Sequence, residues 1–118
     1  MVMAKTLRVM QDEIHENAVA HGWWDGASTP EERHKLIPEK LLLIITEVAE
    51  ATEDYRNGSM DTFLGAGGKP EGFWVEVADA VIRILDLAGA FKVDLEHIIE
   101  VKHEYNKTRP HRHGGKVI

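Results

Sequence analysis

Two strongly apolar segments of this chain each carry a pair of carboxylates three residues apart, and this pattern most constrains how the chain can fold. The first segment, LLLIITEVAEATEDYR, carries Glu47 and Glu50, and the second, FWVEVADAVIRILDLAG, carries Glu76 and Asp79. Residues three apart lie on one face of an α-helix, so each pair points in one direction. Helices that are apolar over most of their circumference are usually buried. The pattern therefore predicts two core helices that carry acids on inward faces.

These four acids indicate a site for a divalent cation. Carboxylates are costly to bury unless they are paired or bound to a metal, and Mg²⁺ prefers oxygen ligands. A single E-x-x-E is common on solvent-facing helices, but here two pairs are joined by a glycine-rich loop over residues 57–72, which allows an antiparallel helical hairpin. We therefore predict that Glu47, Glu50, Glu76 and Asp79 hold Mg²⁺, with Mn²⁺ able to take its place.

The spacing of apolar residues divides the chain into helices. Four main helices are expected, over residues 5–20, 38–56, 70–90 and 94–109. A short helical turn is expected after Thr29, because Thr29, Pro30 and Glu32 form a helix-start pattern. No segment shows the alternation of a β-strand. The sequence thus predicts an all-α fold, a four-helix bundle in a single domain over residues 1–118.

Composition excludes several classes of function. The chain of 118 residues has no cysteine, which rules out disulfides, thiol catalysis and cysteine-based zinc sites. No window approaches the roughly 20 apolar residues of a membrane span, and the N-terminus lacks a signal-peptide core, so we expect no membrane partner and a cytoplasmic location. A net charge of −6 argues against binding to duplex nucleic acid, which relies on many phosphate contacts.

The C-terminal segment is basic although the chain as a whole is acidic. From residue 102 onward, five cations face a single acid: Lys102, Lys107, Arg109, Arg112 and Lys116 against Glu104. An acidic body with a basic tail fits a site for a metal and a polyphosphate. A solvated, frayed C-terminus would have the same composition.

The acid pairs resemble those of the MazG-like, all-α nucleoside triphosphate pyrophosphohydrolases. Many members carry a further acid before the first glutamate, where this chain has Thr46, so four core acids are implied. The chain also matches two further patterns of such enzymes. The first is a histidine followed nine residues later by an aromatic residue, matched by His15 and Trp24. The second is K-x-x-x-N-x-x-R near the C-terminus, matched by Lys102, Asn106 and Arg109. The resemblance implies a homodimer or homotetramer that hydrolyses (deoxy)nucleoside triphosphates to monophosphate and pyrophosphate, for nucleotide-pool housecleaning or shaping.

The chemistry assigns roles to these residues. Hydrolysis between the α and β phosphates needs Mg²⁺, an activated water and positive groups that hold the pyrophosphate. Glu47 or Glu50 would be the general base, and the sequence does not choose between them. Lys102 and Arg109 suit phosphate oxygens, and Asn106 suits either phosphate or sugar.

The remaining candidates concern the base and the edges of the site. The resemblance implies that Trp24 stacks on the base, while His15 bonds to the base or the sugar; alternatively, His15 is a histidine at the edge of the core. Arg83 either reaches the substrate or pairs with Asp79 or Asp86. Lys116 belongs to a tail that either closes over the phosphates or is disordered. Because aromatic stacking tolerates any base, the preferred nucleotide stays open.

Two other classes of protein remain as alternatives. Glu100 and His103 have the E-x-x-H spacing of ferritin-like di-iron bundles, although such bundles need two of these motifs. A non-catalytic helical interaction domain is the other alternative, and the four acids on apolar faces argue against it.

Overall fold

The computed structural model describes residues 4–118, and it is predominantly helical, as predicted. The four main helices are α1 (Leu7–Ala20), α3 (Ile37–Arg56), α4 (Phe73–Ala90) and α5 (Leu95–Lys107). Two short helices, α2 (Pro30–Lys35) and α6 (Arg112–Gly115), follow α1 and α5 in the chain. The all-α class is therefore confirmed, with four long helices close to the predicted bounds.

Side-chain caps fix where several of these helices begin. At α2, the Thr29 hydroxyl accepts a hydrogen bond from the backbone N–H of Glu32 at 3.1 Å, and the Glu32 carboxylate accepts one from the N–H of Ser28 at 3.0 Å. This reciprocal capping is the helix-start pattern expected from the sequence. Thr6 and Asp94 accept from backbone N–H groups in the same way at the starts of α1 and α5.

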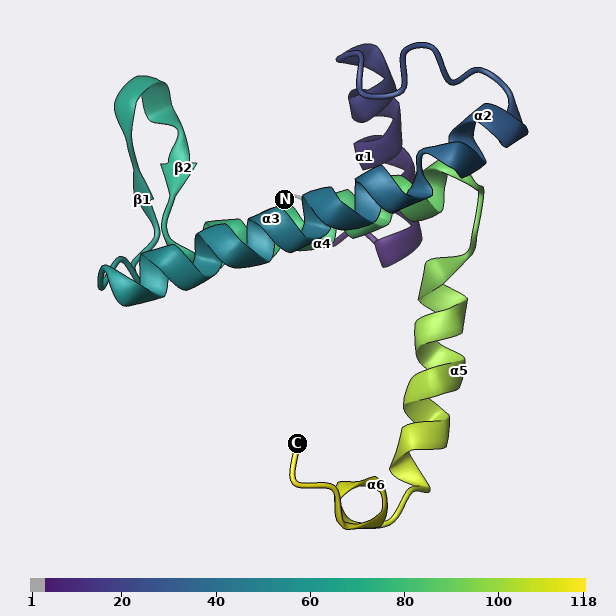
Figure 1. Ribbon diagram of the computed structural model, residues 1–118, viewed down its shortest axis with the longest axis vertical. Coiled ribbons are helices and arrows are strands. Elements are labelled where there is room, and N and C mark those ends of the chain that lie inside the picture. Colours follow the sequence, from purple (N-terminus) through teal and green to yellow (C-terminus); the bar gives the residue numbers. More distant parts are fainter. Residues whose placement is uncertain (1–3) are drawn as a thin grey trace.

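A β-hairpin joins α3 to α4, where the sequence predicted no strand and a helix from Pro70. Strands β1 (Phe63–Leu64) and β2 (Pro70–Glu71) pair antiparallel around a short 3₁₀ turn, η1 (Ala66–Gly68), and project beyond the helices (Figure 1). Gly72 has a φ of 120°, and a Cβ there would clash with the backbone oxygen of Asp61. This backbone conformation is not helical, so α4 begins one residue later, at Phe73.

Helices α3 and α4 lie side by side, and α1 packs on α4 (Figure 1). The end of this three-helix body is filled by Trp24, which is 4% exposed and clusters with Ala18, Ala27 and Ala90. Gly89 allows α1 to approach α4 closely, because a Cβ at Gly89 would meet the Cβ of His15 at 2.6 Å. The core therefore sits where α1, α4 and the segment after α1 meet.

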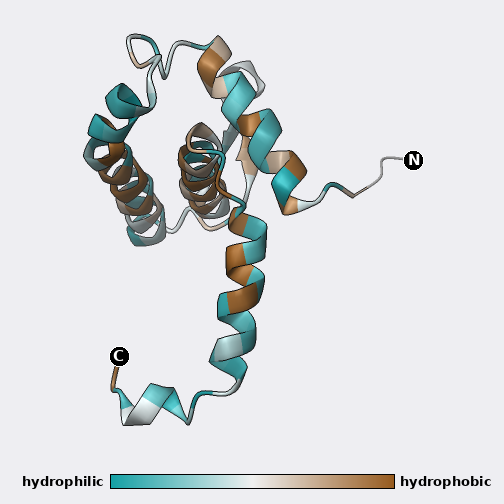
Figure 2. Ribbon diagram, turned by 90° about the vertical axis from the view of Figure 1, so that its right-hand side faces the viewer, coloured by the Kyte–Doolittle hydropathy of each residue, from teal (hydrophilic) through white to brown (hydrophobic). Residues whose placement is uncertain are grey.

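Helix α5 extends away from this body as an arm. Its start is tied to α1: the Glu96 carboxylate accepts from the N–H of Leu7 at 2.9 Å, and Gln11 Nε2 donates to the carbonyl of Val93 at 2.7 Å. Figure 2 shows the apolar residues along α5 without a helix packed against them. The radius of gyration is 16.9 Å, whereas a compact chain of this length has about 13.5 Å. Within one chain, three of the four long helices form the packed body.

The outer faces of α3, α4 and α5 carry many exposed apolar residues. They include Leu42, Ile45, Trp74, Ile98 and Val101, each at least half exposed. We expected α3 and α4 to be buried. In a single chain, only their inner faces are buried. No helix in residues 4–118 combines the length and the apolar character needed to cross a membrane.

Candidate functional site

Three of the four predicted acids converge on one point between α3 and α4. Carboxylate oxygens of Glu47, Glu50 and Glu76 all lie within 4.8 Å of one another. Glu47 is buried, Glu76 is half-buried and Glu50 is exposed. The acid pairs of the two helices thus face each other, as the sequence predicted, and form a group of oxygens that can hold a cation.

The acids of this group disturb one another's protonation. Burial, contact with the Glu50 carboxylate and the charges of Glu50 and Asp79 raise the pKa of Glu76 from 4.5 to about 7. Burial and the charge of Glu47 likewise raise the pKa of Asp79, and the nearby cation of Arg83 opposes this rise. Asp79 lies outside the group of three but within its electrostatic reach. The site therefore carries more negative charge than it can easily hold, which a divalent cation would relieve.

Arg83 compensates one acid of the group. Its Nε donates to Glu47 Oε1 at 2.7 Å, and the Glu47 side chain is 9% exposed. The sequence left open whether Arg83 reaches the substrate or pairs with Asp79 or Asp86; its ion-pair partner is Glu47, from the facing helix. Its guanidinium also lies 5.3 Å from the centre of the Trp23 ring. Arg83 thus connects the acids to the aromatic side of the site.

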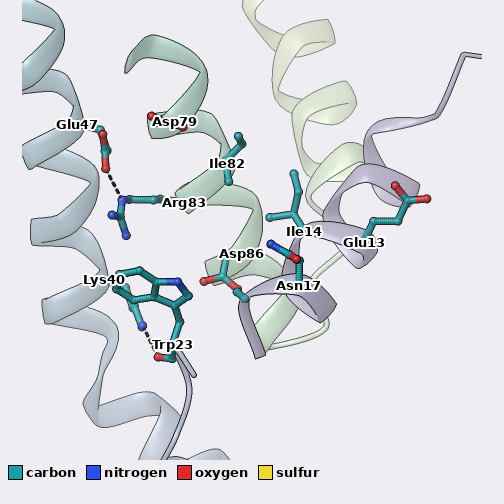
Figure 3. A pocket seen from close by; sticks show the side chains of 11 residues that line it. Glu13, Ile14, Asn17, Trp23, Lys40, Glu47, Asp79, Ile82, Arg83 and Asp86 are labelled. Carbon is teal, nitrogen blue, oxygen red and sulfur yellow. Dashed lines mark hydrogen bonds and ion pairs between the residues drawn. The ribbon is translucent and has the colours of Figure 1, made fainter. Parts of the chain in front are cut away.

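A cavity of about 470 Å³ runs between α1, α3 and α4 from the acids to Trp23 (Figure 3). Glu47 and Asp79 lie at one end, and Ile82 and Arg83 lie in the middle. The far end is polar and aromatic, and is lined by Asn17, Trp23, Lys40 and Asp86. A cavity of this size suits a small ligand that extends away from the acids.

His15 and Trp24 lie together, and both bind Asp86. His15 Nδ1 is 2.8 Å from Asp86 Oδ1, and Trp24 Nε1 donates to the two oxygens of Asp86 at 2.9 and 3.1 Å. Trp24 is buried, whereas Trp23 is 52% exposed and lines the cavity. In this arrangement the aromatic ring that a ligand can reach is Trp23. Trp24 instead packs in the core cluster at the end of the helices.

Lys102, Asn106 and Arg109 share the arm and lie away from the acids of their own chain. Lys102 Nζ and Arg109 Cζ lie 4.9 and 5.9 Å from the centre of the Tyr105 ring, so these two cations share one patch. None of them lines the cavity between α1, α3 and α4. Lys116 follows α6 at the exposed end of the arm (Figure 1). The structure keeps the two cations of the motif together without bringing them to the cavity beside the acids of the same chain.

Glu100 and His103, on which the di-iron alternative depended, are both exposed on the arm. In residues 4–118, the one cluster of three or more metal-ligating side chains is that of Glu47, Glu50 and Glu76. This group offers carboxylate oxygens and contains no histidine.

Comparison of the chain with known protein families, with curated proteins and with solved structures finds no match. A helical fold alone does not define an activity, so the site itself carries the functional information.

Sequence reasoning did not single out Lys40, Asn17 or a structural role for Asp86. Lys40 is 7% exposed, and its Nζ donates to the carbonyl of Trp23 at 2.9 Å. The signal that could have found it is a lysine near the start of an apolar helix. Lysine is rarely buried without a specific reason.

Proposed function

We propose that this protein is a Mg²⁺-dependent nucleoside triphosphate pyrophosphohydrolase of the MazG-like type. The observation that carries the proposal is the meeting of Glu47, Glu50 and Glu76 within 4.8 Å, at the end of a cavity that has room for a nucleoside. Asp79 adds a fourth carboxylate at that end. Mn²⁺ would substitute for Mg²⁺, because both accept oxygen ligands.

The reaction would break the bond between the α phosphate and the bridging oxygen to the β phosphate. A metal held by the acids would neutralise the phosphates and orient them. The oxygen of a water molecule would bond to the α phosphorus, its proton would pass to a carboxylate, and pyrophosphate would leave with the bridging oxygen. Glu50 is the better candidate for this base, because Glu47 is held by Arg83.

We also propose that the arm of a second copy completes the site. Pyrophosphate release needs positive groups, and Lys102, Asn106 and Arg109 do not reach the acids of their own chain. The arm is basic toward its end and the body is acidic, so the two are complementary in charge. Exposed apolar residues on both, such as Ile98 on the arm and Leu42 on α3, would be covered by such a contact. The assembly would be a homodimer or a homotetramer.

Anion-exchange separation of the products from a panel of nucleoside triphosphates tests this function. With Mg²⁺, nucleoside monophosphate and pyrophosphate should appear together, and EDTA should stop the reaction. Glu50→Gln should nearly abolish it. Glu53→Gln is the matched control, because Glu53 lies on the same helix and pairs with Arg56 in solvent. Orthophosphate as the first product, or full activity of Glu50→Gln, would refute the proposal.

A further inference from the structure

We propose that the far end of the cavity binds the nucleobase, and that Asp86 makes it prefer bases with an exocyclic amino group, with cytosine over uracil as the clearest case. This inference rests on the proposed function, because it assumes that the phosphates lie at the acids. The inference assigns Asp86 the role of selecting the base, and so narrows the substrates to nucleotides whose base carries an exocyclic amino group.

The position of the base follows from the shape of the cavity. Asp79 and Asp86 both line it from α4, at opposite ends (Figure 3). Seven residues of helix separate them, a rise of about 10 Å, which the sugar and base of a nucleotide can span. With the triphosphate at Glu47 and Asp79, the sugar passes Ile82 and Arg83 and the base reaches Asp86.

Asp86 is held in place as a hydrogen-bond acceptor. His15 and Trp24 both bind its carboxylate, and the side chain is 14% exposed, with its open side toward the cavity. An ionised carboxylate has about four acceptor sites and no donor. Two neighbours leave acceptor capacity for a ligand. The amino group of cytosine can donate to it, whereas the carbonyl at the same ring position of uracil would be repelled.

The other residues at this end complement such a base. Lys40 is 7% exposed, and in the part of the chain that the structure describes it has no ion-pair partner. An ammonium group has three donors, and the carbonyl of Trp23 takes one, so Lys40 can donate to a ring carbonyl. The Asn17 amide can donate or accept. Trp23 offers an exposed ring for stacking.

The test compares dCTP with dUTP, which differ in the group at ring position 4. We expect the wild-type protein with Mg²⁺ to show kcat/KM at least about tenfold higher for dCTP, as for other hydrogen bonds to base edges. Asp86→Asn keeps the shape but adds a donor that can reach the uracil carbonyl, so the ratio should fall toward one. Asp61→Asn, an exposed aspartate in the loop before β1, should keep the wild-type ratio.

Each outcome separates this inference from the proposed function. Equal kcat/KM for the two nucleotides would overturn base selection and leave the hydrolysis intact. Hydrolysis of neither nucleotide would overturn both. An Asp86→Asn protein that folds, by circular dichroism, and keeps the full preference would show that another residue selects the base. If that variant does not fold, titration of the wild-type protein with dCMP and dUMP decides, and equal affinities would refute the inference.

Discussion

Arg83 and Glu47 form an ion pair of 2.7 Å between α4 and α3, so the acids of the site are not equivalent. Glu47 is nine-tenths buried and has a cation of its own chain as partner. Glu76 lies in the same group of oxygens and, within residues 4–118, forms no ion pair with a cation. Glu47 therefore has a neighbouring cation that offsets its charge, whereas burial and the neighbouring acids raise the pKa of Glu76 to about 7.

The first prediction follows from this difference. In metal-free buffer near pH 8, Glu76→Gln should raise the free energy of unfolding, because it removes a repelled charge. Glu47→Gln should lower it by about 1 to 3 kcal/mol, because it weakens a hydrogen bond between charged groups. Urea denaturation with EDTA measures both changes. The same sign for both variants would contradict this account of the site.

The second prediction concerns pH. The pKa of Glu76 is raised from 4.5 to about 7, so between these values the unfolded chain ionises this group while the folded protein keeps it protonated. The contribution of Glu76 to stability therefore falls as pH rises from 4.5 to 7, and stays at its lowest value above 7.

Metal should reverse this penalty, since Mg²⁺ competes with the proton on Glu76. Saturating Mg²⁺ should raise Tm more near pH 8 than near pH 6. Glu76→Gln should remove most of this difference, and differential scanning fluorimetry measures it. If Mg²⁺ raised the Tm of the wild-type protein equally at both pH values, this would argue against a metal at these carboxylates.

Much of the fold and the acid group could be predicted because both depend on local periodicity. Residues i and i+3 lie on the same face of any helix. Two such pairs on the two helices of a hairpin can therefore face each other. The pairing of Arg83 with Glu47 could not be predicted, because it depends on which turns of α3 and α4 meet. A two-residue strand such as Phe63–Leu64 is too short to show alternation.

The two tryptophans show a second limit of the sequence. Trp23 and Trp24 are neighbours, and only the path of the chain after Gly22, whose φ is 87°, decides which ring is buried. Likewise, the apolar face of α5 predicts that something covers it, but the sequence does not say whether this is the same chain or another.

The third prediction separates these two rings. Trp24→Ala should destabilise the protein by about 3 to 5 kcal/mol, because it empties a buried site and removes one of the two side chains that bind Asp86. Trp23→Ala should leave Tm nearly unchanged and raise KM with little change in kcat. The variant should lose about 1 to 3 kcal/mol of nucleotide binding energy from base stacking. Stacking is equally strong in the ground and transition states, so its loss raises KM and leaves kcat nearly unchanged. An unaltered KM for Trp23→Ala would place the base elsewhere.

The last prediction concerns the arm. If Arg109 of one copy holds the leaving pyrophosphate at the acids of another, Arg109→Ala should lower kcat as well as raise KM, because charge develops on that group in the transition state. Arg109→Lys should recover part of the loss, since lysine lacks the bidentate fork.

Mixing two variants of low activity tests whether the site is shared. Glu50→Gln keeps an intact arm and Arg109→Ala keeps intact acids, so a mixed dimer would contain one complete site. After dissociation and reassociation at equal amounts, about a quarter of wild-type activity should return, because half of the dimers are mixed and half of their sites are complete. Either variant mixed with itself is the control and should keep its low activity. No recovery from mixed dimers, or a 13.3 kDa monomer in sedimentation at micromolar concentration, would show that the arm does not act on a second copy.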